Sequence, residues 1–282
     1  MMAPPEDLAR NGASCRVYRD APSFEGLKTA AIGNFRCDSA EAGTTLLREA
    51  AAMLAAEGYA ALLGPMDGDT WHTYRVVTES DGSAPFAMEP ASGPHDRAAF
   101  EANGFAPVSS YVSTRATLAD AIGQGAPVTV AGVTVTPWDG QNAGRLIGGL
   151  FDMSGSSFAG KAFFKPIARE EFLKLYQPLL PAIDPRFVLF ARDQNGLIGF
   201  LFGLPNLAEG KQPRTVILKT YASARPGVGH LLADTFHRAA RDFGFTDVIH
   251  ALMHVDNASL ARSKRHEARI FRRYVLMARR LS

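Results

Sequence analysis

The sequence predicts an α/β protein in which layered helices and strands form two modest domains. The chain has 282 residues, of which 46% are hydrophobic and 21% charged, an ordinary composition for a globular protein with one or two cores. Strand-like apolar runs alternate with runs of helical periodicity along most of its length. Residues 119–131, ADAIGQGAPVTVA, contain glycine and proline without a long periodic run, which is typical of a linker between domains.

The charge and cysteine content exclude several classes of protein. The formal net charge is +2, so no global field indicates a nucleic-acid partner. Cys15 and Cys37 are the only cysteines and lack the paired spacing of a metal site, so we expect no metal and a reducing, cytoplasmic setting. The N-terminus lacks an apolar core of signal-peptide length, and no segment approaches ~18 uninterrupted apolar residues, so we expect no export signal and no transmembrane segment.

Residues 1–118 form the first predicted domain. Its clearest element is a helix, because apolar residues recur at helical spacing between Ser39, a favoured N-cap residue, and Gly58, a stop signal. The expected elements are, in order, a strand at 26–36, this helix at 39–58, a strand buried on both faces at 59–66, a short helix at 94–105 and a strand at 106–118.

Residues 132–282 form the second predicted domain. Asn195-Gly196 between two apolar runs predicts a hairpin over residues 186–205. Glycines and serines between two expected helices predict a mobile loop at residues 152–164. The remaining expected elements begin with a strand at 132–139, helices within 141–150 and 168–180, a strand at 214–222 and an amphipathic helix at 228–244. A buried strand at 246–257, a short basic helix at 258–267 and a final strand at 268–281 complete the domain.

The junction between the strand at 214–222 and the helix that follows it reads ARPGVGH, residues 224–230. A helix N-terminus carries unpaired backbone donors and partial positive charge, and glycines let a phosphate group approach these donors closely. Gly227 and Gly229 stand at this junction. Taken alone, the same residues also fit a simple Pro-Gly turn, so the motif by itself leaves both interpretations open.

In its element order and in this loop, the second domain resembles the GNAT superfamily of N-acetyltransferases. The pyrophosphate loop of that family has the pattern Gln/Arg-x-x-Gly-x-Gly/Ala, and the run from Ala224 to Gly229 matches both glycines. Ala224 stands where Gln or Arg is usual, and Arg225 lies one position later. The resemblance covers residues 133–281. It implies acetyl-CoA or another acyl-CoA as cosubstrate, bound mainly by the backbone of this loop.

Residues 26–118 resemble a partial second unit of the same family. The corresponding junction, FRCDSAEAGTT, lacks the glycines. The resemblance therefore implies tandem GNAT-like domains, each with a mixed, mainly antiparallel central sheet flanked by helices. The first, at 1–118, would be a degenerate copy, and the second, at 132–282, would bind the acyl-CoA.

The resemblance also implies where the acyl-CoA lies. The thioester would sit in a gap where the strand at 214–222 separates from the strand at 246–257. This places Lys219, Thr220 and Tyr221 on one side of the gap, while strand alternation places His250, Leu252 and His254 on one face of the other strand. The expected cofactor contacts are Thr220, Arg225, Gly227, Val228, Gly229, His230, Asn257 and Ser263.

Amide formation from a thioester needs a neutral amine, a route for its proton and often an acid for the leaving thiolate. We predict His254 as the general base, because it lies nearer the C-terminal end of its strand, where α/β sites form. A histidine bonded to a neighbouring carbonyl is the alternative. His250 is expected to be structural. The family's tyrosine acid is missing near Ser263, and Tyr221, or alternatively Tyr274, could replace it.

The segment DGDTWHTYR, residues 67–75, is unusually rich in functional groups for a loop. Trp71, His72 and Arg75, with Glu89 from FAMEP, are predicted to close over the substrate at the junction of the two domains. The alternative is an interdomain core that contains Trp71 and Tyr74. Four phenylalanines flank the loop at 152–164 and suggest an apolar acceptor, or a packed core, at Phe151, Phe158, Phe163 and Phe164.

Basic residues gather near the C-terminus. Such a run is usually a solvated face, but it could contact the 3′-phosphate of CoA, an anionic membrane or nucleic acid. Strand alternation separates Arg272 from Arg273, which argues against a single basic stripe. The basic residues are Arg262, Lys264, Arg265, His266, Arg269, Arg272, Arg273, Arg279 and Arg280.

Together these observations predict an acyl-CoA-dependent N-acyltransferase. An amine of a small-molecule substrate would attack the thioester directly in a ternary complex. The alternative is a non-catalytic GNAT-like module that binds CoA or a small ligand as a sensor or interaction partner, which the replacement at Ala224 and the missing tyrosine favour. A basic protein associated with RNA or a membrane is a third, weaker hypothesis.

Overall fold

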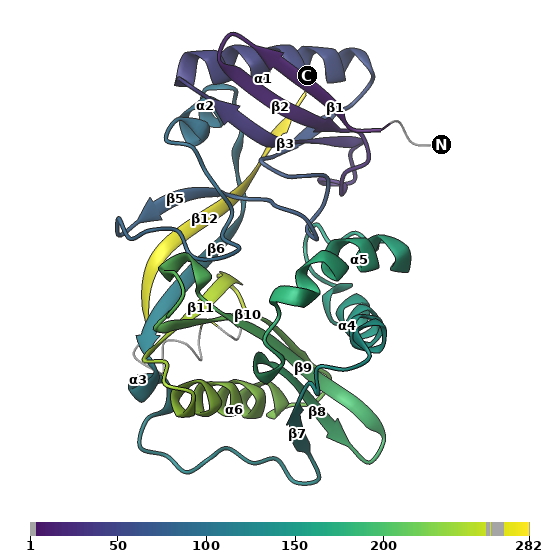
Figure 1. Cartoon of the computed structure of the whole chain (residues 1–282). Coiled ribbons are helices and arrows are strands. Elements are labelled where there is room, and N and C mark those ends of the chain that lie inside the picture. The colour runs from purple at the N-terminus through teal and green to yellow at the C-terminus, as the bar shows by residue number, and fades with distance from the viewer. Residues whose placement is uncertain (1–3, 258–259, 261–267, 282) are drawn as a thin grey trace.

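The computed structural model describes residues 4–257, 260 and 268–281 and has the predicted α/β architecture. One long sheet runs through the molecule, and helices pack against it at both ends (Figure 1). Within the described residues it has 12 strands in the order β1-β2-β3-β4-β12-β6-β11-β10-β9-β8-β7, and β5 pairs with β12. Strands β3 and β4, and β10 and β11, pair in parallel, and the other described pairs are antiparallel, which confirms the predicted mixed, mainly antiparallel sheet.

The N-terminal half of the sheet packs against helix α1 (Ala40–Ala56). The side chain of Ser39 accepts a hydrogen bond from the Ala42 N–H, so the predicted N-cap is present. The first two strands were not predicted, because β1 is short, polar and exposed and is held mainly by its pairing with β2. The strands here are β1 (Glu6–Arg10), β2 (Ala13–Tyr18), β3 (Thr29–Cys37) and β4 (Ala61–Gly64).

The C-terminal half of the sheet packs against helix α6 (Val228–Asp242). Asn195 and Gly196 lie at the tip of the β8–β9 hairpin, as their sequence predicts. Helix α6 joins the parallel strands β10 and β11, as α1 joins β3 and β4. The strands here are β7 (Thr134–Pro137), β8 (Val188–Asp193), β9 (Gly196–Pro205), β10 (Thr215–Ser223) and β11 (Asp247–His254).

The two halves exchange their last strands at the centre of the sheet. Strand β6 (Ala106–Thr117) leaves the first half and pairs with β11 of the second. Strand β12 (Arg269–Arg280) leaves the second half and pairs with β4 of the first. The two exchanged strands also pair with each other along most of their length, and β5 (Val76–Ser80) adds to the edge of β12. Apart from β5 and β7, which have no counterparts, the strand order is therefore symmetric about the β12–β6 pair.

The remaining helices are α2 (Asp96–Ala102), α3 (Leu118–Ile122), α4 (Ala143–Phe158) and α5 (Arg169–Tyr176), with 3₁₀ turns at Gln177–Ala182, Pro185–Phe187 and Leu207–Glu209. The mobile loop predicted from residue 152 is wrong over its first half, because α4 continues to Phe158 and buries Leu146, Ile147 and Ser154 along one face. The predicted basic helix at 258–267 lies, except for residue 260, outside the described residues. No helix among the described residues is long and apolar enough to cross a membrane.

Each half has its own hydrophobic core. In the first, Leu47 and Leu54 of α1 pack with Ile32 of β3. In the second, Leu232 and Phe236 of α6 belong to the cluster that buries the inner faces of β8 to β11. These cores fix each parallel strand pair against its connecting helix.

The predicted linker at 119–131 is tied to α6. The backbone N–H of Val128 donates to the Asp234 carboxylate at 3.0 Å, and Arg238 donates to the Gly125 carbonyl at 2.9 Å. Asp234 also pairs with Arg238. The segment therefore lies across the helix that begins at the glycine loop. The domain boundaries at 118 and 132 stay a prediction, because β6 and β12 place both halves in one sheet.

Helix α6 packs closely on the sheet at Gly203 of β9. A Cβ atom at Gly203 would lie 2.3 Å from Cε2 of Phe236 and 3.0 Å from the Ile217 carbonyl oxygen. We therefore expect Gly203→Ala to lower the free energy of unfolding by about 1–3 kcal/mol, as overpacking does. Gly149→Ala is the matched control: its nearest neighbour would be 3.8 Å away, and alanine favours the helix by about 1 kcal/mol. Urea unfolding measures both, and equal effects would contradict this packing.

Candidate functional site

A cavity of about 910 Å³ lies beside the point where β10 and β11 separate. Three groups of residues form its walls. The loop at 67–75 and residues 88–90 come from the first half, α4, α5 and the segment between them contribute an aromatic and aliphatic wall, and β9, β10, α6 and β11 contribute the third wall. The cavity therefore lies between the two halves and in the size range of small-molecule sites.

The predicted gap between the two strands is present. Parallel pairing of β10 with β11 covers Thr215–Leu218 and Asp247–His250 and then stops. Beyond this paired stretch, β10 continues beside β9 and β11 continues beside β6. The pairing of β10 with β9 is irregular at Lys219, which has no partner residue in the register. Each strand thus has a bulge, and the two strands separate from each other at the cavity.

The strict alternation predicted for His250, Leu252 and His254 is wrong. Leu252 has φ +56°, and the register with β6 shifts between His250 and Met253. Because of this bulge, consecutive residues of β11 from His250 to His254 all contribute to the cavity wall. A bulge of this kind depends on the partner strand, so alternation along one strand could not predict it.

The glycine loop stands at the start of α6, next to the cavity. Gly227 caps the helix with φ +85°, a conformation that favours glycine, and Val228 and Gly229 are buried in the first turn. His230 from that turn contributes to the cavity wall. Arg225 is exposed and donates to the Ala131 carbonyl at 3.2 Å, so it is held near the loop. A 15-residue helix with glycines at its start fits a pyrophosphate group.

The equivalent place in the first half is filled. A Cβ atom at Gly33 of β3 would lie 2.2 Å from Oδ1 of Asp67 and 2.4 Å from the Met66 carbonyl oxygen. The same Oδ1 accepts a hydrogen bond from the Asn34 N–H at 2.6 Å, and the Met66 N–H donates to the Ile32 carbonyl at 2.9 Å. The chain itself therefore occupies the space beside β3 that remains open beside β10.

His254 lies in the cavity wall, with its ring edge-on to Tyr111 at 5.2 Å between centroids. Its Nδ1 accepts a hydrogen bond from the Asp256 N–H at 3.2 Å. Because a backbone N–H can only donate, the neutral ring carries its hydrogen on Nε2. His254 then donates from Nε2, and it can take up a proton only by giving up the Asp256 bond. The structure thus gives His254 a backbone N–H partner in place of the carbonyl considered from sequence.

His250 is held in a buried network. Its Nε2 lies 3.0 Å from Nε2 of His237 on α6, and its Nδ1 lies 3.3 Å from the Thr114 hydroxyl. His237 and His250 are 3% and 6% exposed. The pair ties α6 to β11 at the back of the cavity, in keeping with the structural role expected for His250.

Thr220, Tyr221 and Asn257 also contribute to the cavity wall, on the two sides of the gap. Tyr274, the other candidate acid, is buried and bonds to Glu89 and Ser113, so it is engaged in the protein interior. Ser263, the remaining predicted cofactor contact, lies outside the described residues.

Trp71 and His72 lie in the cavity wall as predicted, and Trp71 is also packed. Its indole N–H donates to the Lys165 carbonyl at 2.7 Å, and its ring lies edge-on to Phe164 and Phe172. His72 bonds to Asp69 at 2.7 Å, which raises the pKa of the imidazole. The packing interpretation therefore applies to Trp71, and its contact with a substrate stays a prediction. Of the four flanking phenylalanines, Phe158 and Phe164 reach the cavity, while Phe151 packs on Phe172 and Phe163 stacks on Phe24.

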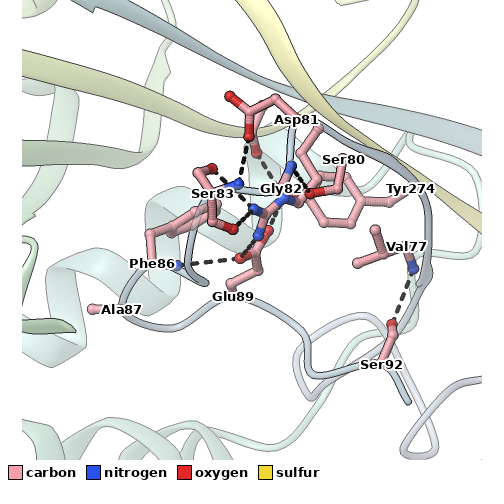
Figure 2. Close-up of polar contacts among 12 residues, drawn as sticks. Val77, Ser80, Asp81, Gly82, Ser83, Phe86, Ala87, Glu89, Ser92 and Tyr274 are labelled. Carbon is pink, nitrogen blue, oxygen red and sulfur yellow. Dashed lines mark hydrogen bonds and ion pairs between the residues drawn. The ribbon is translucent and has the colours of Figure 1, made fainter. Parts of the chain in front are cut away.

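Glu89 is the centre of a buried network (Figure 2). Its carboxylate accepts hydrogen bonds from Arg272 and Tyr274 and from the Phe86 N–H, and Arg272 also binds Ser83. The side chains of Glu89 and Arg272 are 2% and 4% exposed. Arg272 therefore departs from the solvated basic face expected for it, because Glu89 provides a buried counter-charge. Arg273 pairs with Glu79 at the surface.

Arg75 lies in the cavity wall and is 8% exposed. Its guanidinium carbon is 3.9 Å from the ring centroids of both Tyr74 and Tyr111, and it also donates to the Tyr74 hydroxyl. Its Nε is buried without a hydrogen-bond partner. The two rings hold the cation in place without neutralising its charge.

Lys219 is the residue whose chemistry the sequence did not reveal. It occupies the irregular position of β10, lies in the cavity wall, and donates from Nζ to the Met88 carbonyl at 2.8 Å. Burial, with a contribution from the charge of Arg75, lowers the pKa of its ammonium to about 7. A lysine in an apolar strand carries no sequence signal for such a shift, because the shift depends on what surrounds its side chain.

The Lys219 ammonium should make stability depend on pH. Its pKa is about 7 in the folded state and near 10.4 when unfolded, so between these values the unfolded chain binds more protons. We expect the free energy of unfolding to rise from pH 7 to pH 10 relative to a Lys219→Met variant, by at most about 1.4 kcal/mol per pH unit. Urea unfolding of both proteins at pH 6, 8 and 10 measures this. A constant difference across that range would contradict the lowered pKa.

The two charges of the buried Glu89–Arg272 pair should contribute to folding stability together. Glu89→Met leaves Arg272 charged and unpaired, and we expect it to cost about 3–5 kcal/mol of folding free energy. The double variant Glu89→Met/Arg272→Met removes both charges and should be more stable than the Glu89→Met single variant. The exposed pair Arg97–Glu101 is the matched control, since its removal should change stability by less than about 1 kcal/mol. Urea unfolding measures the stability of each variant, and a double variant no more stable than the single would show that the two charges are not coupled.

No protein-family model and no curated protein matches the sequence, whereas solved structures match the fold. A GCN5-related N-acetyltransferase from Sphaerobacter thermophilus superposes with a TM-score of 0.58 at 14% identity, covering 96% of this chain and 77% of that one. A tandem GNAT protein from the clavulanic acid biosynthesis pathway gives 0.56 at 15% identity, covering 96% and 79%. A probable N-acyltransferase from Enterococcus faecalis gives 0.57 at 12% identity, covering 96% and 59%.

These matches extend over nearly the whole chain and include a protein described as a tandem GNAT protein. At the level of the fold, they confirm the resemblance expected from the element order and the glycine loop. The chain therefore has the fold of the GCN5-related N-acetyltransferases.

Proposed function

We propose that the protein is an acyl-CoA-dependent N-acyltransferase, which transfers an acyl group, acetyl in the simplest case, to a small-molecule amine. The continuity of the cavity carries this proposal. Its wall extends from the first turns of α6, past the gap between β10 and β11, to the aromatic residues of α4 and α5. A thioester and an acceptor amine can therefore meet in one continuous cavity.

The residues of the second half fit a CoA thioester. Acyl-CoA supplies an activated carbonyl when bound. The backbone of Gly227, Val228, Gly229 and His230 would face the pyrophosphate at the positive end of α6, with Arg225 as an exposed charge beside it. Thr220 and Asn257 are our further candidates for cofactor contacts. Because Asp67 and Met66 fill the equivalent space beside β3, we propose one CoA site per chain, in residues 132–282.

The acceptor amine must lose a proton during attack on the thioester. We propose that Lys219 accepts this proton, because Lys219 lies at the gap and its lowered pKa leaves part of the Lys219 side chains neutral near pH 7. His254 would donate from Nε2 to the oxygen or sulfur on which negative charge develops, and Tyr221, across the gap, is a second candidate donor. Trp71 and His72 would contact the acceptor.

Thermal unfolding with acyl-CoA, followed by thiol release, tests the function. Acetyl-CoA at 100 times its Kd should stabilise the fold by about 2.7 kcal/mol, and longer acyl-CoAs report the acyl length accepted. An amine panel with acetyl-CoA should then release free CoA. We expect Lys219→Met to keep the thermal shift and to lose roughly 10²- to 10⁴-fold in kcat, as the loss of a general base does.

Lys211→Met is the matched control, because Lys211 is an exposed lysine outside the cavity. It should leave the thermal shift and kcat unchanged. No stabilisation by any acyl-CoA would refute the proposal. Stabilisation without thiol release for any amine would instead identify a non-catalytic CoA-binding module, the alternative that Ala224 favours in sequence.

A further inference from the structure

Arg75 is a buried cation that the protein leaves without a counter-charge. It is 8% exposed, and its Nε lacks a hydrogen-bond partner. Within the part of the chain that the structure describes, it forms no ion pair with Asp or Glu; its contacts are Tyr74 and Tyr111. A buried charge is costly unless it is paired and hydrogen-bonded. Its position in the cavity wall suggests that a ligand supplies the missing anion.

The carboxylates of the cavity wall are already engaged. Glu89 binds Arg272 and Tyr274. Asp67 accepts from the Asn34 N–H, and Asp256 is a largely exposed residue next to His254. None of them pairs with Arg75.

Lys219 adds a second basic group to the same region. The charge of Arg75 contributes to lowering the pKa of Lys219, so the two side chains are electrostatic neighbours. Glu89 acts on Lys219 in the opposite direction, but its carboxylate is shared with Arg272 and Tyr274. An anion bound here would therefore supply Arg75 with the counter-charge that these residues do not provide. The planar guanidinium matches a carboxylate in a two-bond geometry.

We propose that the acceptor amine also carries a carboxylate, as an α-amino acid does, and that Arg75 binds this carboxylate. The presence of an amine in this ligand rests on the proposed acyl transfer, whereas the carboxylate is inferred from Arg75. An α-amino acid carries amine and carboxylate on one carbon, and Lys219 and Arg75 both line the cavity that would hold it. The side chain of the amino acid would lie against the aromatic wall, where Trp71, Phe164 and Phe172 pack together.

A phosphate of CoA is the other anion that the cavity region would hold. Its expected place is the start of α6, where the helix N-terminus and Arg225 lie. Arg75 belongs to the loop at 67–75 of the first half, and its charge acts on Lys219 of β10 across the same cavity. The acceptor is therefore the better source of the carboxylate, and the affinity for CoA itself separates the two sources.

Calorimetry on the CoA-saturated protein tests the carboxylate site. The 20 common amino acids are first screened by thermal shift, and the best ligand is compared with its decarboxylated amine, for example L-phenylalanine with 2-phenylethylamine. We expect the amino acid to bind at least 10-fold more tightly. Arg75→Gln should weaken amino-acid binding by roughly 10- to 100-fold, the range for a hydrogen bond to a charged group, and leave binding of the decarboxylated amine unchanged.

Arg115→Gln is the matched control. Arg115 also has a buried Nε without a partner and packs on an aromatic ring, Phe271, at 4.6 Å, but it lies outside the cavity wall. Its substitution should not change amino-acid affinity. Arg75→Lys keeps the charge and should retain part of the affinity, which separates loss of the carboxylate contact from loss of the fold.

The outcomes separate this inference from the proposed function. Equal affinity for the amino acid and its decarboxylated amine, or no Arg75-dependent binding of any amino acid, would overturn the carboxylate site, even if neutral amines still release thiol from acetyl-CoA. An equal loss of CoA affinity in Arg75→Gln would overturn it in favour of a cofactor phosphate. Arg75-dependent binding without thiol release would support the carboxylate site and refute acyl transfer.

Discussion

The reciprocal exchange of β6 and β12 is the constraint on which the rest of the structure depends. Each half forms a parallel strand pair around its own helix, but the hydrogen-bonding edge of that pair is completed by the last strand of the other half. The exchanged strands also pair with each other, so the two cores are connected by a continuous ladder of backbone hydrogen bonds. A parallel pair with an open edge would be exposed to pairing with other chains, and the exchange removes both edges.

The exchange also positions the cavity. Strand β11 leaves β10 because β6 continues to hold it, and the loops of the first half that precede β6 are thereby brought opposite β10. The two halves have equivalent topology but different interiors at this point. Beside β3 the Asp67 carboxylate and Met66 fill the space, whereas beside β10 it stays open and connects with the start of α6. One half thus provides the gap, and the other provides part of its enclosure.

The distribution of buried charge gives the cavity its chemical character. Glu89, Arg272 and Tyr274 form an ion-paired network that joins the loop before α2 to β12, with only the Nε of Arg272 left without a hydrogen-bond partner, and His237 with His250 ties α6 to β11. These groups serve the scaffold, because their hydrogen bonds are made within the protein. Arg75 and Lys219 differ, because both line the shared cavity and, among the described residues, neither forms an ion pair with a carboxylate. Unsatisfied charge of this kind is concentrated where ligands bind.

The sequence by itself determined the α/β class, most of the strands and helices, the hairpin at Asn195-Gly196, and the glycine loop before α6. Periodicity, caps and turn residues act over a few neighbours, so one chain segment is enough to reveal them. The tertiary structure decided the rest: the β1–β2 pairing, the strand exchange, the bulges at Lys219 and Leu252, and the burial of Arg272 against Glu89. These features depend on partners that are distant in sequence. The lowered pKa of Lys219 and the unpaired charge of Arg75 have the same origin, because both follow from what packs around a side chain and not from the residue itself.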